Sequence, residues 1–482
     1  MLDKRKFDLE MEQVRRDQIE DMAEYLKGYL SVNSHIRERK IVREPDMESL
    51  KILDDTPIPR KGRDPKVVAD EMIEHVYQKA MVTQHPRFFS FVPSAVSPYS
   101  LAGSILTDIY NPFSGGFNYA AGAGLIEEKL IAWMASLAGY PKDTAGGVFV
   151  SGGSIATMTA LIAARNNKLK ETEYPQGVAY LSDQTHSSVA KGLRMIGFRS
   201  DQIVILPSDD DFKMRVDLLE EAIKKDKAAG KKPFCVIGTV GTTNTGSIDP
   251  LNAIAAIAKE HGLWMHVDGA YGGSILMSDI YRNLAKGIEN SDSLSWDTHK
   301  WALQTYSCST VLVRDKNTLL EAFTEHPEYL EDVRSSEHND SWDLGPEMSR
   351  PHRCLKLWFT LQAMGTDRMA DVIDYSFFNA RQVEKGLRAR EGWEITSKPM
   401  CGAITFRFVP DGFSDEELDA LCGAISERTI EDGFTYIVTS TLKGKRVLRM
   451  CLINGNTTDQ DVTDTVEYLD RIAREIAASF KK

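Results

Sequence analysis

The sequence predicts an α/β fold with a mainly parallel sheet enclosed between helices. Short β-branched runs alternate with longer helical patterns through residues 86–365, and strand–helix–strand units of this length form parallel crossovers. The flanking segments differ: residues 1–85 are charged and helical, whereas residues 366–482 combine helices with strand-like runs. We therefore expect an N-terminal helical segment (1–85), a large domain (86–365) and a small C-terminal α+β domain (366–482).

The clearest crossover lies at residues 234–267. Residues 234–239 form an apolar run typical of a buried strand, and residues 263–267 form the next one. Between them, Asp249 is expected to cap a helix with Pro250 at its first position, and Gly262 is expected to end that helix.

The composition argues against several classes of protein. With 58 Lys and Arg against 70 Asp and Glu, the formal net charge is −12, and no basic stripe indicates nucleic acid as a partner. No run approaches the roughly 18 apolar residues that span a bilayer, and the charged N-terminus is unlike a secretory signal. Six scattered cysteines without a CxxC pair predict neither a disulfide framework nor a metal site. We therefore expect a soluble, cytoplasmic protein.

Polar and glycine-rich motifs follow five of the expected strands. In an open parallel sheet, ligands collect beyond the carboxyl ends of the strands, so these motifs are the candidates for a binding site. They are "SGGS" (151–154), "DQTHSS" (183–188), "GTTNTGS" (241–247), "VDGAYGG" (267–273) and "DTHK" (297–300).

The first motif leads from a strand into a helix. Gly152 and Gly153 let backbone amides approach a ligand, Ser154 can donate a hydrogen bond, and the helix N-terminus favours an anion. A plain tight turn is the alternative. The motif is neither GxxxxGK[ST] nor GxGxxG, so neither a nucleoside triphosphate nor a dinucleotide is indicated.

Three side chains of the other motifs each have a structural and a chemical interpretation. Asp268 ends a buried strand, where an unpaired carboxylate is costly, so it either caps a helix or keeps a heteroaromatic nitrogen protonated. Lys300 is either a surface lysine or a partly buried amine that forms a Schiff base. His186 is either a polar residue at a helix start or a flat ring that stacks on a cofactor. A phosphate cradle, a carboxylate, a stacking ring and a reactive lysine together meet the demands of pyridoxal phosphate.

The same motifs give the sequence a resemblance to a known family. From "HPRFFSFVP" (85–93) to the C-terminal domain, the chain resembles the group II pyridoxal-phosphate-dependent amino-acid decarboxylases, and within them most closely the bacterial aromatic-L-amino-acid (tryptophan) decarboxylases. The resemblance implies the aspartate-aminotransferase-like fold (PLP fold type I) and pyridoxal 5'-phosphate as cofactor. It also implies a homodimer with its active sites at the interface.

The resemblance further implies roles for individual residues. Lys300 matches the lysine that forms the Schiff base, Asp268 the partner of the cofactor's ring nitrogen, and His186 the ring stacked over it, which is also implicated in proton handling. The remaining matches are cofactor-binding positions. Gly153 and Ser154 match the phosphate loop, His299 matches a phosphate contact, Thr243 and Ala270 match neighbours of the ring, and Asp297 stands where some members have asparagine.

The expected substrate rests on a few aromatic positions. Phe91, Phe113 and Trp342 match substrate-side positions and suggest an aromatic pocket, although core packing is the commoner use of such residues. Arg350 belongs to "MSRPHRCLKLW" (348–358), which resembles the segment that closes the catalytic lid. No Arg or Lys aimed at an acidic side chain can be identified. We expect decarboxylation of an aromatic L-amino acid to the arylalkylamine and CO2, with tryptophan favoured and phenylalanine or tyrosine as alternatives.

The lid departs from the family pattern. Many members have a lid tyrosine that protonates the substrate's Cα, near residues 339–342 of this chain, but the only tyrosine of residues 325–350 is Tyr329. Either Tyr329 serves in its place or another group delivers the proton. Related enzymes without the tyrosine form an aldehyde instead, so an aromatic aldehyde synthase is one alternative and a decarboxylase of another amino acid is a second. A catalytically silent relative and a nicotinamide dehydrogenase are more distant alternatives.

Overall fold

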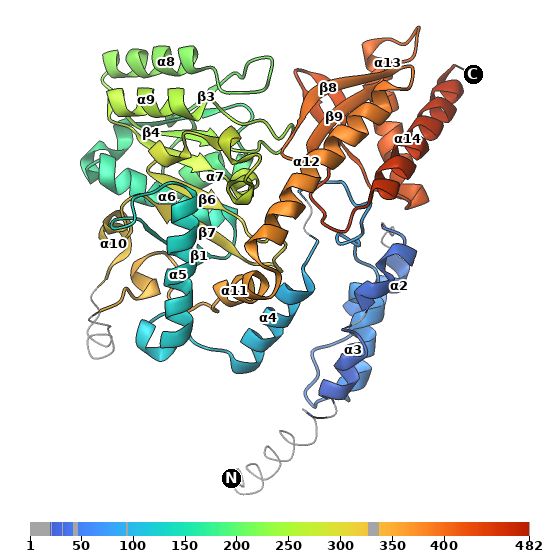
Figure 1. Ribbon diagram of the computed structural model, residues 1–482, viewed down its shortest axis with the longest axis horizontal. Coiled ribbons are helices and arrows are strands. Elements are labelled where there is room, and N and C mark those ends of the chain that lie inside the picture. The colour runs from blue at the N-terminus through green and yellow to red at the C-terminus, as the bar shows by residue number, and fades with distance from the viewer. Residues whose placement is uncertain are drawn as a thin grey trace, which may run out of the picture.

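The computed structural model describes residues 20, 22–30, 32–41, 47–92, 95–325 and 337–481 of the chain. This part forms a large α/β body, a smaller sheet-and-helix unit at the C-terminal end, and N-terminal helices that project to one side (Figure 1). The predicted sheet between helices and the small C-terminal α+β unit are confirmed. The residue bounds predicted for the three parts stay predictions.

The large sheet has seven strands in the order β1-β7-β6-β5-β4-β2-β3. Six strands point in one direction, and β7 alone runs antiparallel to its two neighbours. Parallel neighbours need crossover connections, which explains why apolar strands alternate with helices along this part of the sequence. The strands are β1 (Gly146–Val150), β2 (Gly177–Ser182), β3 (Ile203–Leu206), β4 (Lys232–Thr239), β5 (Trp264–Asp268), β6 (Ser293–Trp296) and β7 (Ser309–Val313).

Helices cover both faces of this sheet, because successive strand residues point to opposite sides. Phe149 and Val236 pack with helices α5, α8 and α9 in one core, whereas Val148 and Ile237 pack with α6, α7 and α10 in another. The strands are therefore buried almost throughout. The helices are α5 (Ala121–Leu137), α6 (Gly153–Lys168), α7 (Ser187–Met195), α8 (Val216–Ala228), α9 (Leu251–His261) and α10 (Asn317–Phe323).

The crossover from β4 to β5 follows the predicted order with two corrections, one of which is that Pro250 lies just before α9 (Leu251–His261) rather than at its first position. Gly262 ends α9 in the left-handed conformation, with φ 75°, as expected. The prediction that Asp249 caps α9 is wrong. Its Oδ1 accepts a hydrogen bond from the Met214 amide at 2.7 Å, and its Oδ2 accepts one from the Thr239 amide at 2.8 Å. Asp249 thus ties the loop after β4 to the segment before α8, a contact across 35 residues that local pattern does not reveal.

The C-terminal unit has a four-stranded antiparallel sheet in the order β10-β11-β9-β8. The two strand-like runs of the sequence form β9 and β11, and the core between sheet and helices includes Phe406, Leu448 and Val466. Helix α12 connects this unit to the large body, where α4 and α11 pack together (Figure 1). The elements are α4 (Pro98–Tyr110), α11 (Cys354–Met364), α12 (Thr366–Arg388), β8 (Trp393–Met400), β9 (Ala403–Phe408), α13 (Asp415–Asp432), β10 (Val438–Leu442), β11 (Lys445–Cys451) and α14 (Asp459–Phe480).

An N-terminal arm, residues 47–81, extends away from the large sheet (Figure 1). Its helices α2 (Met47–Asp55) and α3 (Pro65–Met72) are separated by residues 56–64, whose prolines and glycine do not continue a helix. No residue of α3 is buried. Large apolar side chains of the arm stay exposed in the single chain, among them Ile52, Ile58, Val67, Val76 and Tyr77.

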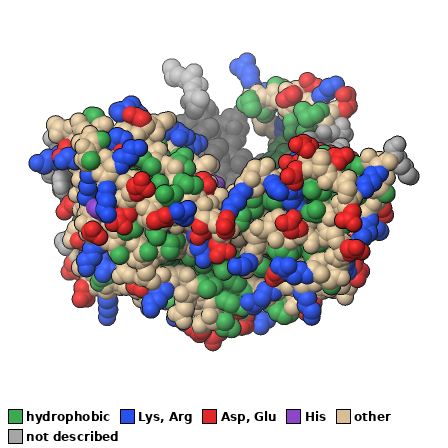
Figure 2. All heavy atoms as spheres, turned by 90° about the horizontal axis from the view of Figure 1, so that it is seen from above, with side chains coloured by type: hydrophobic (Ala, Val, Ile, Leu, Met, Phe, Trp, Pro, Cys, Tyr) green, Lys and Arg blue, Asp and Glu red, His purple; other side chains and the backbone are tan. Residues whose placement is uncertain are grey.

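The surface and the thiols are consistent with the composition. On the face in Figure 2, basic and acidic side chains are interspersed, and neither sign gathers into a continuous patch. Within the described ranges, no helix combines the length and apolar character needed to cross a membrane. All six cysteines are free and buried: Cys235, Cys308, Cys354, Cys401, Cys422 and Cys451.

Candidate active site

A cavity of about 490 Å³ lies where the carboxyl ends of β1, β2, β4, β5 and β6 meet. We call it the Lys300 cavity. All five polar motifs of the sequence contribute to its wall, as the topology of a parallel sheet requires. Its lining includes nine of the predicted residues: Gly153, Ser154, His186, Thr243, Asp268, Ala270, Asp297, His299 and Lys300.

Lys300 forms an ion pair inside this cavity. Its Nζ lies 2.9 Å from Oδ2 of Asp297, and its side chain is 26% exposed while that of Asp297 is 2% exposed. Burial lowers the pKa of Lys300, but the charge of Asp297, its hydrogen bond to the amine and the charge of Asp268 together outweigh burial, so the net pKa lies above the ordinary value. In the single chain, Lys300 is therefore a protonated amine beside a buried carboxylate, which rules out the alternative of an ordinary surface lysine.

Asp297 is held between Lys300 and the start of helix α6. A Cβ added at Gly153 would lie 2.6 Å from Oδ2 of Asp297, so only glycine fits there without displacing the carboxylate. The ring Nε2 of His299 lies 3.8 Å from the same oxygen. Among the described residues, Oδ1 of Asp297 has no hydrogen-bond partner. This oxygen of Asp297 can therefore accept a further hydrogen bond close to Lys300.

Asp268 borders the cavity at the last position of β5. Its Oδ1 accepts hydrogen bonds from the Ala270 amide at 3.1 Å and from the Ser295 hydroxyl at 3.4 Å. The bond to Ala270 spans two residues and closes an Asx-type turn, so Asp268 stabilises its own loop rather than capping a helix. The same contacts fix the position of a buried negative charge at the cavity wall.

His186 confirms one of the two interpretations that the sequence left open, the polar residue at a helix start, while stacking on a cofactor stays a prediction. It precedes α7, and its Nδ1 accepts a hydrogen bond from the Ser188 amide at 3.2 Å, with the Ser188 hydroxyl 2.7 Å away. An accepting Nδ1 places the proton of the neutral ring on Nε2. His186 therefore caps the helix, and its exposed ring also borders the cavity.

His299 is fixed by the start of β7. Its backbone amide donates to the Cys308 carbonyl at 3.0 Å, and its Nδ1 lies 2.9 Å from the same oxygen. Burial lowers the pKa of His299, and the nearby Asp297 carboxylate only partly opposes this, so the net pKa stays below the ordinary value. A neutral ring at physiological pH can donate or accept one hydrogen bond at the cavity.

Tyr306 is the most informative residue that the sequence did not single out. It lines the Lys300 cavity, and its ring centroid lies 5.0 Å from that of His299. The only sequence signal was its position six residues after Lys300. Gly152, which the sequence singled out for its backbone, also lines the cavity, and the lining residues without a predicted role are Ser151, Ile155, Thr157, Ser188, Thr239, Gly241 and Tyr271.

The predicted substrate-side aromatics lie away from this cavity in the single chain. Phe113 packs against Tyr119 and Trp342, with ring centroids 5.2 and 6.4 Å away, and Phe91 lies near Tyr436 at 6.1 Å. Phe91 and Phe113 are exposed, whereas Trp342 is buried. Their role in binding a substrate stays a prediction. The other lid candidate, Tyr329, lies outside the described residues.

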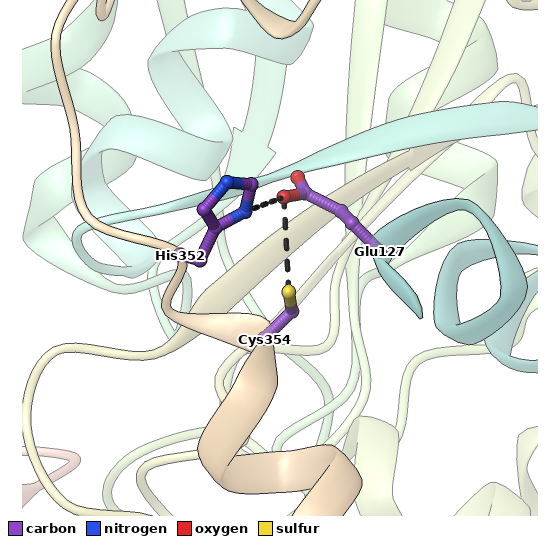
Figure 3. A group of neighbouring side chains, drawn as sticks. All are labelled: Glu127, His352 and Cys354. Carbon is purple, nitrogen blue, oxygen red and sulfur yellow. Dashed lines mark hydrogen bonds and ion pairs between the residues drawn. The ribbon is translucent and has the colours of Figure 1, made fainter. Parts of the chain in front are cut away.

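Arg350 also points elsewhere. Its Nη2 donates to Oε1 of Glu127 at 2.7 Å, and both side chains are buried. Burial raises the pKa of Glu127, but the charge of Arg350 and the hydrogen bonds from Arg350, His352 and the Phe149 amide together outweigh burial and lower it to about 2. Figure 3 shows the other neighbours of this carboxylate: His352 Nδ1 and Cys354 Sγ each lie 3.8 Å from Oε2. These are metal-ligand types, but the adjacent guanidinium repels a cation, so we interpret the group as a buried ion pair.

Comparison with known proteins identifies the family of the chain. Residues 48–409 match the family model described as "Pyridoxal-dependent decarboxylase conserved domain". An aromatic-L-amino-acid decarboxylase of Bacillus atrophaeus is 33% identical over 94% of this chain and 96% of its own length. Human cysteine sulfinic acid decarboxylase is 33% identical over 77% of each chain.

Solved structures show the same architecture. Oryza sativa TDC with PLP and tryptamine aligns with a TM-score of 0.90 and 25% identity, over 96% of this chain and 98% of that one. Rhodiola rosea 4-hydroxyphenylacetaldehyde synthase aligns with a TM-score of 0.87 and 24% identity, over 95% of this chain and 97% of that one. The second likeness concerns the fold alone.

Proposed function

Because the chain belongs to the pyridoxal-dependent decarboxylase family, we propose that it converts an aromatic L-amino acid, tryptophan above all, to the arylalkylamine and CO2. The protein is a pyridoxal-5'-phosphate-dependent amino-acid decarboxylase, a carboxy-lyase. The substrate and the roles of individual residues are what the proposal adds.

The Lys300 cavity fits the cofactor. Its volume of about 490 Å³ is within the roughly 300–1,000 Å³ typical of small-molecule sites. Among the described residues, no side chain caps the start of α6, and a Cβ at Gly152 would meet nothing within 4 Å. Open space therefore lies over a helix N-terminus, which suits a phosphate group. Gly153, Ser154 and His299 are the residues to which we assign phosphate binding.

Pyridoxal phosphate supplies an electron sink when bound, because its protonated ring accepts the electron pair released as a bond to the substrate's Cα breaks. We assign covalent attachment of the cofactor's aldehyde carbon to the amine of Lys300 and retention of the ring-nitrogen proton to Asp268. His186, Thr243 and Ala270 pack around the ring in this proposal. Asp297 keeps Lys300 oriented and charged until the amine is needed.

One observation supports an aromatic substrate most directly. Among the described residues that line the cavity, Lys300 is the only Lys or Arg. The substrate side chain therefore meets no free cation in the single chain, which disfavours an acidic amino acid. The relative from Bacillus atrophaeus, matched over nearly its whole length, carries an aromatic amino acid in its name. Tryptophan is favoured because the Oryza sativa structure contains tryptamine.

We further propose a homodimer with the active site at its interface. The N-terminal arm exposes apolar side chains and buries no residue of α3, and Phe113 and Tyr119 are exposed aromatics. A second copy of the chain would cover these surfaces and bring an aromatic cluster to the opposing Lys300 cavity. Sedimentation of the full chain tests this: a dimer is expected, and a monomer at micromolar concentration would contradict it. The cytoplasm is the proposed compartment, because all six buried cysteines are unpaired.

The experiment that tests the reaction uses purified protein, added pyridoxal phosphate and a pool of the common L-amino acids in air. Mass spectrometry of the products should show aromatic amines, with tryptamine dominant. Lys300→Ala should abolish them, whereas Lys259→Ala, which changes an exposed lysine of α9, should not. An amine from an acidic amino acid would contradict the proposed substrate.

The second candidate function is an aromatic aldehyde synthase. It is favoured by the absence of tyrosine from residues 337–350 of the sequence, where lid tyrosines are expected. In the same experiment, an aldehyde together with hydrogen peroxide and ammonia would support this alternative and contradict simple decarboxylation.

A further inference from the structure

We propose that the phenol of Tyr306 delivers the proton to the substrate's Cα after CO2 has left. The inference rests on the proposed function and deepens it, because it names the proton donor for that reaction. It assigns this step to a residue of the cavity wall, whereas the expected donor is a tyrosine of the lid.

The position of Tyr306 is the first argument. Tyr306 borders the same cavity as Lys300, Asp268 and His186, the residues that the proposal places around the cofactor. Its ring lies beside His299, 5.0 Å between centroids. A general acid must come within hydrogen-bond reach of the atom that it protonates, and the cavity wall is where that condition can be met.

The state of its hydroxyl group is the second argument. Two tyrosines line the cavity, Tyr271 and Tyr306. Tyr271 is buried, and its hydroxyl donates to the Cys401 carbonyl, so its proton is already engaged. Tyr306 is 69% exposed, and in the part of the chain that the structure describes its hydroxyl has no hydrogen-bond partner. Of the two phenols, only that of Tyr306 is available to a substrate.

The third argument is that the backbone of this segment is held in place. Nζ of Lys356 donates to the carbonyls of Thr305 and Tyr306, at 3.1 and 3.2 Å. The amide of Thr305 donates to the hydroxyl of Ser100 at 2.9 Å. Lys356 and Ser100 are both buried, on α11 and α4, which pack against each other. These hydrogen bonds fix the backbone of Tyr306, and a general acid must be held in position to act on its substrate.

The proposed step balances in atoms and charge. Loss of CO2 breaks the bond between Cα and the carboxylate carbon and leaves its electron pair with Cα and the cofactor. The O–H bond of Tyr306 then breaks, a C–H bond forms at Cα, and the phenolate takes a proton from solvent water. No oxidant is consumed, so a protein that uses this step forms the amine and no aldehyde.

The test compares Tyr306→Phe with Tyr110→Phe, which removes the hydroxyl of an exposed tyrosine at the end of α4. Tyr306→Phe should bind pyridoxal phosphate normally, as judged from its near-visible absorbance. Its kcat should fall by about 10²-fold or more, the usual contribution of general acid–base catalysis, while KM stays within about threefold. The share of aldehyde among the products should rise. Tyr110→Phe should match the wild type in every respect.

Two results would overturn the inference: an unchanged kcat and product ratio in Tyr306→Phe, or a loss confined to KM, which would make Tyr306 a substrate contact only. A second readout does not depend on turnover. Nitration by tetranitromethane, mapped by mass spectrometry, should modify Tyr306 in cofactor-free protein, and pyridoxal phosphate should protect Tyr306 but not Tyr110. If the wild type makes no amine, the proposed function is wrong. If pyridoxal phosphate does not protect Tyr306 from nitration, Tyr306 does not lie beside the cofactor and the inference is wrong whatever the activity.

Discussion

The amine of Lys300 and the carboxylate of Asp297 form a buried ion pair, 2.9 Å between Nζ and Oδ2, although Asp268 was the carboxylate expected to matter most. The two carboxylates therefore have separate tasks. Asp297 touches the lysine, whereas Asp268 is bound by the Ala270 amide and the Ser295 hydroxyl at the end of β5. Substitution of Asp297 and substitution of Asp268 should therefore have different effects.

Asp297→Asn should lower the pKa of Lys300, because the charge that opposes burial is removed. More of the amine is then unprotonated at neutral pH and able to attack an aldehyde. Borohydride trapping of pyridoxal phosphate on the protein should therefore reach half its maximum at a pH lower by about one unit. Asp183→Asn, at an exposed aspartate, serves as the control. An unchanged midpoint in Asp297→Asn would refute the assigned influence of Asp297.

Asp268→Asn should reduce kcat far more than stability. The amide oxygen of Asn can still accept from Ala270 and Ser295, so the loop is retained while the negative charge is lost. We expect kcat to fall by about 10²-fold or more, as for the loss of a preorganised electrostatic group. Thermal unfolding should shift by only a few degrees, on the scale of about 1 kcal/mol. Near-normal turnover would show that the ring nitrogen has another partner.

Gly153→Ala should weaken cofactor binding. The added Cβ would lie 2.6 Å from Oδ2 of Asp297 and would displace the carboxylate from Lys300. We expect the Kd for pyridoxal phosphate to rise by about tenfold, or about 1.4 kcal/mol, in an absorbance titration. Gly122→Ala is the matched control, because a Cβ there meets nothing within 4 Å. Equal affinities of the two variants would show that the site accommodates the methyl group.

The Glu127–Arg350 pair should contribute to stability in a pH-dependent way. The pKa of Glu127 is about 2 in the folded protein, below its ordinary value of 4.5, so the contribution is complete above about 4.5 and is lost as the pH falls toward 2. The size of the effect is roughly 3 kcal/mol, at about 1.4 kcal/mol per pKa unit.

Urea unfolding at a series of pH values checks this prediction. In Glu127→Gln the free energy of unfolding should be lower at pH 6, because Arg350 is left buried without its charge partner. It should also depend less on pH between about 4.5 and 2 than in the wild type. A parallel pH dependence in both proteins would mean that other carboxylates dominate acid unfolding.

The parts of the site that could be predicted are the short local motifs that follow individual strands. The motifs at residues 151–154, 183–188, 241–247, 267–273 and 297–300 all reach one cavity, because parallel strands bring their carboxyl ends to the same edge. Gly262 likewise ends its helix through a purely local conformational preference. Periodicity and turn chemistry are sufficient for features of this kind.

The parts that escaped prediction depend on contacts between distant segments. Asp249 looked like a helix cap, but it binds the amide of Met214, 35 residues away. Arg350 was matched to the segment that closes the catalytic lid, and its pairing with Glu127, 223 residues away, was not predicted. Tyr306 was missed because nothing in its immediate sequence shows that α4 and α11 hold its backbone beside Lys300. Partners at such separations are set by tertiary packing, which a single sequence does not display.

The six buried cysteine thiols can be used to measure local opening of the native chain. A bulky thiol reagent can reach such a group only when the surrounding structure separates, so each labelling rate reports the free energy of one opening event. Cys235 lies in β4 of the large sheet and Cys354 at the start of α11, whereas Cys422 lies in α13 and Cys451 at the end of β11. The order in which these positions are labelled would therefore show, without any engineered probe, whether the C-terminal unit loosens before the sheet that carries the cofactor.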